Sequence, residues 1–141
     1  MTALDSMVRV HGWMLEEKQR KLADLQALLR KLADDLASLD QELDAEREAA
    51  GKSDEAGAAY PAFVAAALDR RKKLCKTIAN LEKESEAARA EVTEAFGELK
   101  KYEIASDNRQ VQESDKRKRS ERINLDELGV SIYRRSRVVG E

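Results

Sequence analysis

Residues 22–43 read LADLQALLRKLADDLASLDQEL, and the leucines of this stretch recur at alternating intervals of three and four residues. The series comprises Leu22, Leu25, Leu29, Leu32, Leu36, Leu39 and Leu43. Such an apolar repeat keeps one stripe of a helix against a partner helix and is typical of a left-handed coiled coil. The spacing continues toward the N-terminus, less regularly, through Lys18, Leu15, His11, Val8 and Leu4. We therefore predict a first long helix over residues 1–50.

A second run with the same alternation occupies residues 64–102. Its members are Val64, Ala67, Arg71, Leu74, Ile78, Leu81, Ser85, Ala88, Val92, Ala95, Leu99 and Tyr102. Between the two runs, Gly51 suits the left-handed position that follows a helix end. Pro61 suits a first helical turn, where its missing N–H costs nothing. We therefore predict a loop over residues 51–60 and a second helix that is paired over residues 61–108.

Two long helices joined by about ten residues fold back as antiparallel neighbours. Facing positions in such a pair have residue numbers with a constant sum. The two runs match when this sum is 110, which places Leu43 opposite Ala67 and Leu22 opposite Ala88, so that large side chains mostly face small ones. A register shifted by one heptad fits the spacing as well. The predicted fold is all-α, an antiparallel coiled-coil hairpin whose second helix is longer and overhangs at its C-terminal end.

The predicted overhang, residues 109–141, has no partner within the chain. It carries nine Lys or Arg and six Asp or Glu, a net charge of +3, against −5 for the rest of the chain. Because an unpaired polar helix is marginal in water, we expect this segment to be helical or partly disordered. Its residues Leu125, Leu128 and Ile132 share one helical face, and an apolar stripe of this kind favours an external partner. A frayed tail is the alternative.

The composition argues against several classes of protein. Charged residues make up 38% of the chain and aromatic residues 4%, with a single proline, which is typical of long helices and not of a sheet sandwich or barrel. His11 has no neighbours at ligand spacing, and Cys75 has no second cysteine to pair with. No phosphate-binding glycine loop or nucleophile elbow is present. We predict no enzymatic activity, no metal and no cofactor. Lacking a secretion signal and an apolar membrane span, the chain is expected in the cytoplasm.

Three features are candidates for binding. The densest basic run is Lys116, Arg117, Lys118 and Arg119. It suits an acidic protein surface or, with less support because no aromatic residues are interleaved, nucleic acid; a solvated helix face is the plain alternative. Trp13 falls on the outer face of the first helix, and tryptophan is frequent at binding hot spots; alternatively it covers the overhanging second helix. Phe63, near the loop end, is either a contact or part of the core.

Three local stretches resemble a known family. They are Tyr60-Pro-Ala-Phe63-Val64, Leu99-Lys-Lys-Tyr-Glu103, and Leu125-Asp-Glu-Leu128 with the following Tyr133-Arg-Arg135. In this order, on two antiparallel helices with a longer second one, they resemble the FliJ family of the bacterial flagellar export apparatus. The resemblance implies a non-enzymatic cytoplasmic protein that lies at the cytoplasmic face of the inner membrane through its protein partners. It also implies a likeness to the coiled-coil stalk of rotary ATP synthases.

The resemblance further implies three partners: the hexameric export ATPase, the cytoplasmic domain of the membrane export gate, and export chaperones. The end with both termini would bind and stimulate the ATPase, through Trp13, Lys116, Arg117, Lys118, Arg119, Leu125, Leu128 and Ile132. The gate would contact Phe63 and Ala67, whereas Arg70 stands where the family can have a small apolar residue. The alternatives are a homo-oligomeric structural coiled coil, a stalk protein of a virulence-type secretion system, and a nucleic-acid adaptor that uses the basic run.

Overall fold

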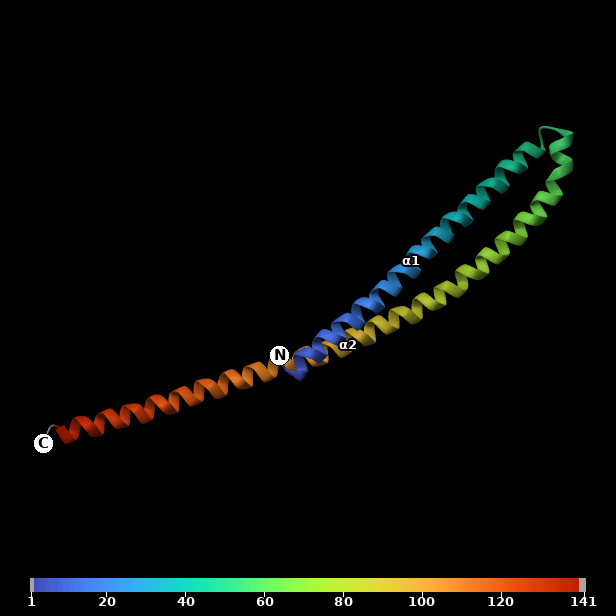
Figure 1. Ribbon diagram of the computed structural model, residues 1–141. Helices are drawn as coiled ribbons and strands as arrows, with labels where there is room; N and C mark the ends of the chain where they lie inside the picture. Colours follow the sequence, from blue (N-terminus) through green and yellow to red (C-terminus); the bar gives the residue numbers. More distant parts are fainter. Residues whose placement is uncertain (1, 140–141) are drawn as a thin grey trace. The chain divides into compact units, whose positions relative to one another are not determined.

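The computed structural model describes residues 2–139. These residues form two α-helices and no strand: α1 spans Ala3–Ala50 and α2 spans Asp54–Val139 (Figure 1). The helices pack against each other and α2 is the longer one, which confirms the predicted all-α hairpin. Helix α2 continues through the predicted overhang, and residues 140 and 141 of that segment lie outside the described residues.

Contacts between Cα atoms divide the chain into two compact units. The terminal unit consists of Met1–Gly12 and Glu98–Glu141, and the hairpin unit consists of Trp13–Gly97. Each unit therefore contains one segment of α1 and one segment of α2.

A single seam forms the core of the hairpin unit. Every residue that the sequence placed on the seam between Leu15 and Ala95 is buried or half-buried. The most deeply buried apolar residues are Leu15, Leu39, Ala67 and Ala88, with exposed fractions between 2% and 8%. Full burial of a leucine contributes about 1.5–3 kcal/mol. Because most seam leucines are only half-buried, stability depends on the number of layers along the seam rather than on any one of them.

Two positively charged seam residues form ion pairs with acidic residues of the other helix. Arg71 occupies a seam position, and its Nε donates a hydrogen bond to Oδ1 of Asp40 over 2.9 Å. Lys18 also occupies a seam position, and its Nζ lies 3.3 Å from Oε2 of Glu91, which Lys21 approaches to 3.7 Å. Both long side chains can keep their stems on the seam while their charged heads stay near water.

These ion pairs select the register that the apolar spacing left open. Each of Lys18–Glu91 and Arg71–Asp40 stands within one residue of the predicted register. A slip of one heptad in one direction would place Arg47 opposite Arg71, and a slip in the other direction would place Ala33 there. Like charges repel and a lost partner leaves the guanidinium unpaired, so both slipped registers are less favourable.

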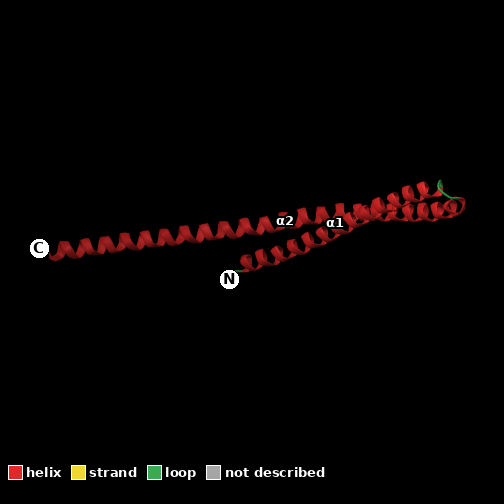
Figure 2. Ribbon diagram, turned by 90° about the horizontal axis from the view of Figure 1, so that it is seen from above, coloured by secondary structure: helices red, strands yellow, loops and turns green. Residues whose placement is uncertain are grey.

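The connection between the helices is shorter than predicted. Ser53 caps α2, because its Oγ accepts a hydrogen bond from the backbone N–H of Ala56 over 3.1 Å, and Asp54 and Glu55 place negative charge in the first turn. Residues 54–60 are therefore helical, and the prediction of a loop over 51–60 was wrong; only residues 51–53 separate the helices (Figure 2). The start of α2 lies close to the end of α1, since a Cβ on Gly57 would stand 3.2 Å from the carbonyl oxygen of Ala50.

Two other details of the connection differ from the prediction. Gly51 does not have a left-handed conformation, because no residue among 2–139 has positive φ. Instead, α1 ends in a tightened turn in which Gly51 N–H donates to the Glu48 carbonyl (3.2 Å) and Lys52 N–H to the Ala49 carbonyl (3.1 Å). Pro61 lies inside α2 and not at its start. Its ring crowds the preceding turn, and α2 bends near its beginning in Figure 1.

We expect the Arg71–Asp40 pair to show charge coupling. Arg71→Asp and Asp40→Arg should each lower the melting temperature, because each places two like charges side by side. The double exchange should recover part of the loss, since it restores an opposite pair. Thermal unfolding followed by circular dichroism measures all four proteins as a double-mutant cycle. A purely additive cycle would contradict the role of this pair in the register. The effect should be modest and should shrink in high salt, because both side chains are partly exposed.

We also expect the stability to depend on pH through Glu91. The hydrogen bond from Lys18, helped by the charges of Lys18 and Lys21, lowers the pKa of Glu91. A carboxylate with a lowered pKa stabilises the fold above its unfolded pKa of about 4.3, and this contribution is lost as the pH falls through the folded value. Melting temperatures between pH 7 and pH 3 should therefore fall less steeply for Glu91→Gln than for the parent. The matched control is Glu94→Gln, an exposed position on the same helix; identical slopes for both variants would rule out the contribution of Glu91.

Candidate protein-binding surfaces

A hydrogen-bonded group formed by Thr2, Asp5 and Ser106, here called the polar clasp, holds the first turn of α1 in the terminal unit. The Asp5 carboxylate accepts a hydrogen bond from the Thr2 backbone N–H over 3.1 Å, and Thr2 Oγ1 accepts one from the Asp5 backbone N–H over 3.2 Å. This reciprocal arrangement is a capping box. The second oxygen of Asp5 accepts a hydrogen bond from Ser106 Oγ on α2 over 3.1 Å. These bonds, first those from Thr2 and then that from Ser106, lower the pKa of Asp5.

An aromatic layer lies next to the clasp. The rings of His11 and Tyr102 stack with centroids 4.6 Å apart and an angle of 19° between their planes. Both residues occupy predicted seam positions, so the only histidine of the chain has a structural partner across the seam. Ser106, which is 9% exposed, is the last buried residue along α2 among those described. In the terminal unit, burial along α2 therefore ends at Ser106, two residues before the predicted end of the paired region at residue 108.

Beyond Ser106, α2 has no cover within the terminal unit. From Asp107 to Val138 every side chain is exposed except Ser114, which is half-buried. Ion pairs between residues one turn apart stabilise this helix locally; in Arg109–Glu113, for example, Nε and Oε1 are 3.3 Å apart. The segment from Asp107 to Val139, here called the extension, is thus a helix whose side chains from Asp107 to Val138 are exposed except for the half-buried Ser114.

The extension carries an apolar stripe. Leu125, Leu128 and Ile132 share a helical face and are 67%, 57% and 58% exposed. Ile104 and Val111, exposed to 58% and 59%, precede Leu125 at multiples of seven residues and therefore continue the same line. Ile104 and Val111 were not predicted as binding residues, although the sequence shows their heptad spacing to Leu125 through Lys118. The extension stripe consists of Val111, Leu125, Leu128 and Ile132 within the extension and of Ile104 just before it.

The side chains of the basic run, residues 116–119, point in all directions around the axis of the extension. Lys116, Arg117, Lys118 and Arg119 are all exposed. Because consecutive residues of a helix are about 100° apart, four of them in a row distribute their charges around the whole circumference. Lys118 lies in line with the extension stripe. A partner that covers the stripe therefore also meets positive charge.

A second surface lies in the hairpin unit near the loop. Phe63 is half-buried, Arg70 is exposed, and Ala67 is 6% exposed and belongs to the seam. The three residues line one shallow groove of about 170 Å³ together with Leu39, Glu42 and Ala66. The structure thus brings the predicted gate-contact residues together, but only Phe63 and Arg70 present substantial side-chain surface there.

Trp13 belongs to the hairpin unit, whereas the basic run and the extension stripe belong to the terminal unit. Its side chain is 61% exposed, as expected for the outer face of α1. The next residue, Met14, is 45% exposed. Trp13 is therefore an accessible aromatic side chain and does not contribute to the seam.

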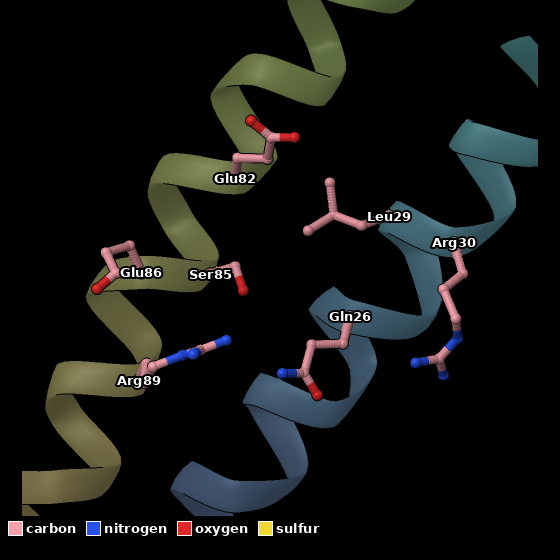
Figure 3. Close-up of a pocket in the computed structure, with 7 residues that line it drawn as sticks. All are labelled: Gln26, Leu29, Arg30, Glu82, Ser85, Glu86 and Arg89. Carbon is pink, nitrogen blue, oxygen red and sulfur yellow. The ribbon is translucent and has the colours of Figure 1, made fainter.

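One open groove of the hairpin unit lies beside Ser85. Figure 3 shows Ser85 and Leu29 directed into an open groove between α1 and α2, with Gln26, Arg30, Glu82, Glu86 and Arg89 around it. The groove exists because Ser85 is small where a seam residue is usually large. Residues 2–139 contain no group of three or more His, Cys, Asp or Glu side chains that could hold a metal ion. Within the same residues, neither helix has an apolar stretch that could cross a membrane.

The comparisons with known proteins agree with this geometry. The family model described as "Flagellar FliJ protein" matches residues 1–138, which is nearly the whole chain. Neither the curated proteins nor the solved structures that were searched gave a match. A family match of this extent also associates the chain with the flagellar export apparatus in general. The chain folds as a two-helix coiled-coil hairpin with a longer second helix, and the family model matches it over residues 1–138. The chain is therefore a member of the flagellar FliJ family.

Proposed function

We propose that the chain is a non-enzymatic stalk of the flagellar export apparatus that binds and stimulates the hexameric export ATPase through its extension. The observation that supports this most directly is the exposure of the extension stripe beside the basic run. Four basic residues surround a helix that is about 10–12 Å in diameter with its side chains, which suits insertion into a narrow, acidic opening. Association with a partner would also supply the packing that an unpaired helix lacks.

In this proposal the other partners bind elsewhere. The cytoplasmic domain of the export gate contacts Phe63 and Arg70 at the loop end, with Ala67 supporting them from the seam. Export chaperones are escorted by the same hairpin, and membrane association is indirect, through these proteins. Trp13 adds a contact with the ATPase ring. The stalk is cytoplasmic and lies at the inner membrane during export.

A homo-oligomeric coiled coil is less well supported, because the apolar stripes of α1 and α2 already pack against each other within the chain. Every predicted seam residue from Leu15 to Ala95 is at least half-buried by the partner helix. A parallel dimer of α1 would have to break this pairing. Direct nucleic-acid binding also has less support, since the basic run is not interleaved with aromatic residues.

The ATPase contact can be tested on the extension stripe. Replacing Leu125, Leu128 and Ile132 together with serine should weaken binding to the ATPase by at least 30-fold and abolish stimulation, because buried apolar anchors dominate interfaces. The matched control replaces Ile123 and Val130, which are 50% and 51% exposed and lie on the opposite face. Binding is measured by calorimetry and stimulation by phosphate release. If both variants stimulate like the parent, the assignment of the stripe to the ATPase is wrong.

The gate contact can be tested independently at the loop end. Phe63→Ala should reduce the affinity for the isolated cytoplasmic domain of the gate about tenfold or more, while ATPase stimulation stays at the parental level. Leu68→Ala removes an apolar side chain that is 52% exposed nearby on the same helix and serves as the control. Biolayer interferometry with the immobilised gate domain measures both variants. Equal affinities for Phe63→Ala and the parent would remove Phe63 from the gate surface.

A further inference from the structure

The apolar residues of the extension belong to one face that repeats along the helix. Positions on this face alternate at intervals of three and four residues, as the leucines of α1 do. Its members are Val111, Ser114, Lys118, Glu121, Leu125, Leu128 and Ile132. All of them are exposed except the half-buried Ser114. An alternation of this kind keeps one stripe of a helix against another helix. We propose that two copies of this chain pair through their extensions as an antiparallel coiled coil.

Charged residues at the centre of this face select the direction of pairing. When the extensions run antiparallel with Lys118 facing Glu121 of the second copy, two-fold symmetry makes the contact twice. The same alignment places Asp115, at the edge of the face, beside Arg122 of the second copy, also twice. Every charged layer then joins opposite charges. In a parallel pair each residue would meet its own counterpart, so that Lys118 would face Lys118 and Glu121 would face Glu121.

The apolar residues fit the same alignment. Leu128 faces Val111 of the second copy, and Leu125 faces Ser114, so that each of these layers sets a large side chain against a smaller one. In the single chain Val111, Leu125 and Leu128 are 59%, 67% and 57% exposed. Pairing would cover all three in both copies, and removal of this apolar surface from water favours association.

The charged layers also fix the register. A shift by one heptad would place Lys118 opposite Leu128 in one direction and opposite Ser114 in the other, and both shifts separate the opposite charges. Charged residues on the face specify the alignment at a cost in stability. Ile132, at the end of the overlap, faces Asp107 and adds little. We therefore expect a weak and reversible dimer.

Helix α1 leaves this face of α2 open. In the terminal unit, α1 contacts Tyr102 and Ser106 on α2. Because consecutive residues of a helix are about 100° apart, Ile104 and Val111 lie on the opposite side of α2 from these two seam residues. Pairing between copies and pairing within the chain therefore use different sides of α2. The proposed dimer keeps the seam of the hairpin intact, unlike a parallel dimer of α1.

The dimer does not depend on the proposed ATPase contact, but the two exclude each other, because both cover the extension stripe. While no other partner is bound, a second copy shields the apolar side chains of the stripe from water. The occupant of the stripe is thus either a second copy or another protein.

Sedimentation equilibrium of the full chain at low salt tests the pairing from micromolar to submillimolar concentrations. The parent should form dimers reversibly. Lys118→Glu and Glu121→Lys should each weaken association roughly tenfold or more, because each makes the central layers like-charged. An equimolar mixture of the two variants should associate like the parent, since one variant has two acidic residues at the centre of the face and the other has two basic ones.

The matched controls are Arg134→Glu and Glu127→Lys, which make the same changes of charge at exposed positions on the outer side of the extension. Both should associate like the parent. Circular dichroism verifies that every variant keeps the helicity of the hairpin. Because the mixture changes no contact within either chain, its recovery separates pairing between copies from an effect on the helix itself.

A spin label at Ser131→Cys in the full chain with Cys75→Ala measures the direction of pairing. In the antiparallel alignment the two labels of a dimer should be about 35 Å apart, within reach of pulsed electron resonance. A parallel pair would bring them to about 10 Å. The proposal is overturned if the labels are that close, or if the mixture associates no better than either variant alone. It is also overturned if the parent stays monomeric at every concentration, in which case the stripe serves a different protein. None of these measurements involves the ATPase, so the outcome is separate from that of the stimulation assay.

Discussion

The structure depends on one apolar seam that each helix can bury only against the other. Every layer of this seam is thin and open to water on two sides, which is why even its leucines are mostly half-buried. A core of this kind specifies direction and spacing weakly, because neighbouring heptads are nearly equivalent. The charged pairs at its edge, Arg71 with Asp40 and Lys18 with Glu91, therefore carry much of the specificity, although each contributes little stability.

The helical part of the fold could be predicted because its signal is repeated many times. The alternation of three and four residues places each seam residue correctly, from Leu4 to Leu43 on α1 and from Val64 to Tyr102 on α2. The connection between the helices could not be predicted as well, because it rests on single residues. Proline favours a first turn, yet Ser53 caps the helix earlier and the chain accepts Pro61 in its interior at the expense of one backbone hydrogen bond and a bend.

The candidate binding surfaces were only partly predictable for a related reason. Leu125, Leu128 and Ile132 were recognisable as an apolar stripe, but Ile104 and Val111 were hidden among polar residues and adjoin the paired region. Their exposure becomes evident only once Ser106 is seen to end the seam. Ala67 illustrates the opposite case, because the sequence places it both on the seam and at a contact position of the family pattern, and the structure shows its side chain buried in the seam.

The three residues between the helices also bear on how the chain folds. Closing so short a loop costs little conformational entropy. We therefore expect the helices to pair first beside residues 51–53, and pairing then to extend along the seam away from the loop. The bond between Asp5 and Ser106 joins residues 101 positions apart and would form last. By the same logic it opens first. The length of α2 that is unpaired, and so accessible to a partner, is therefore set by the final and most reversible step of folding.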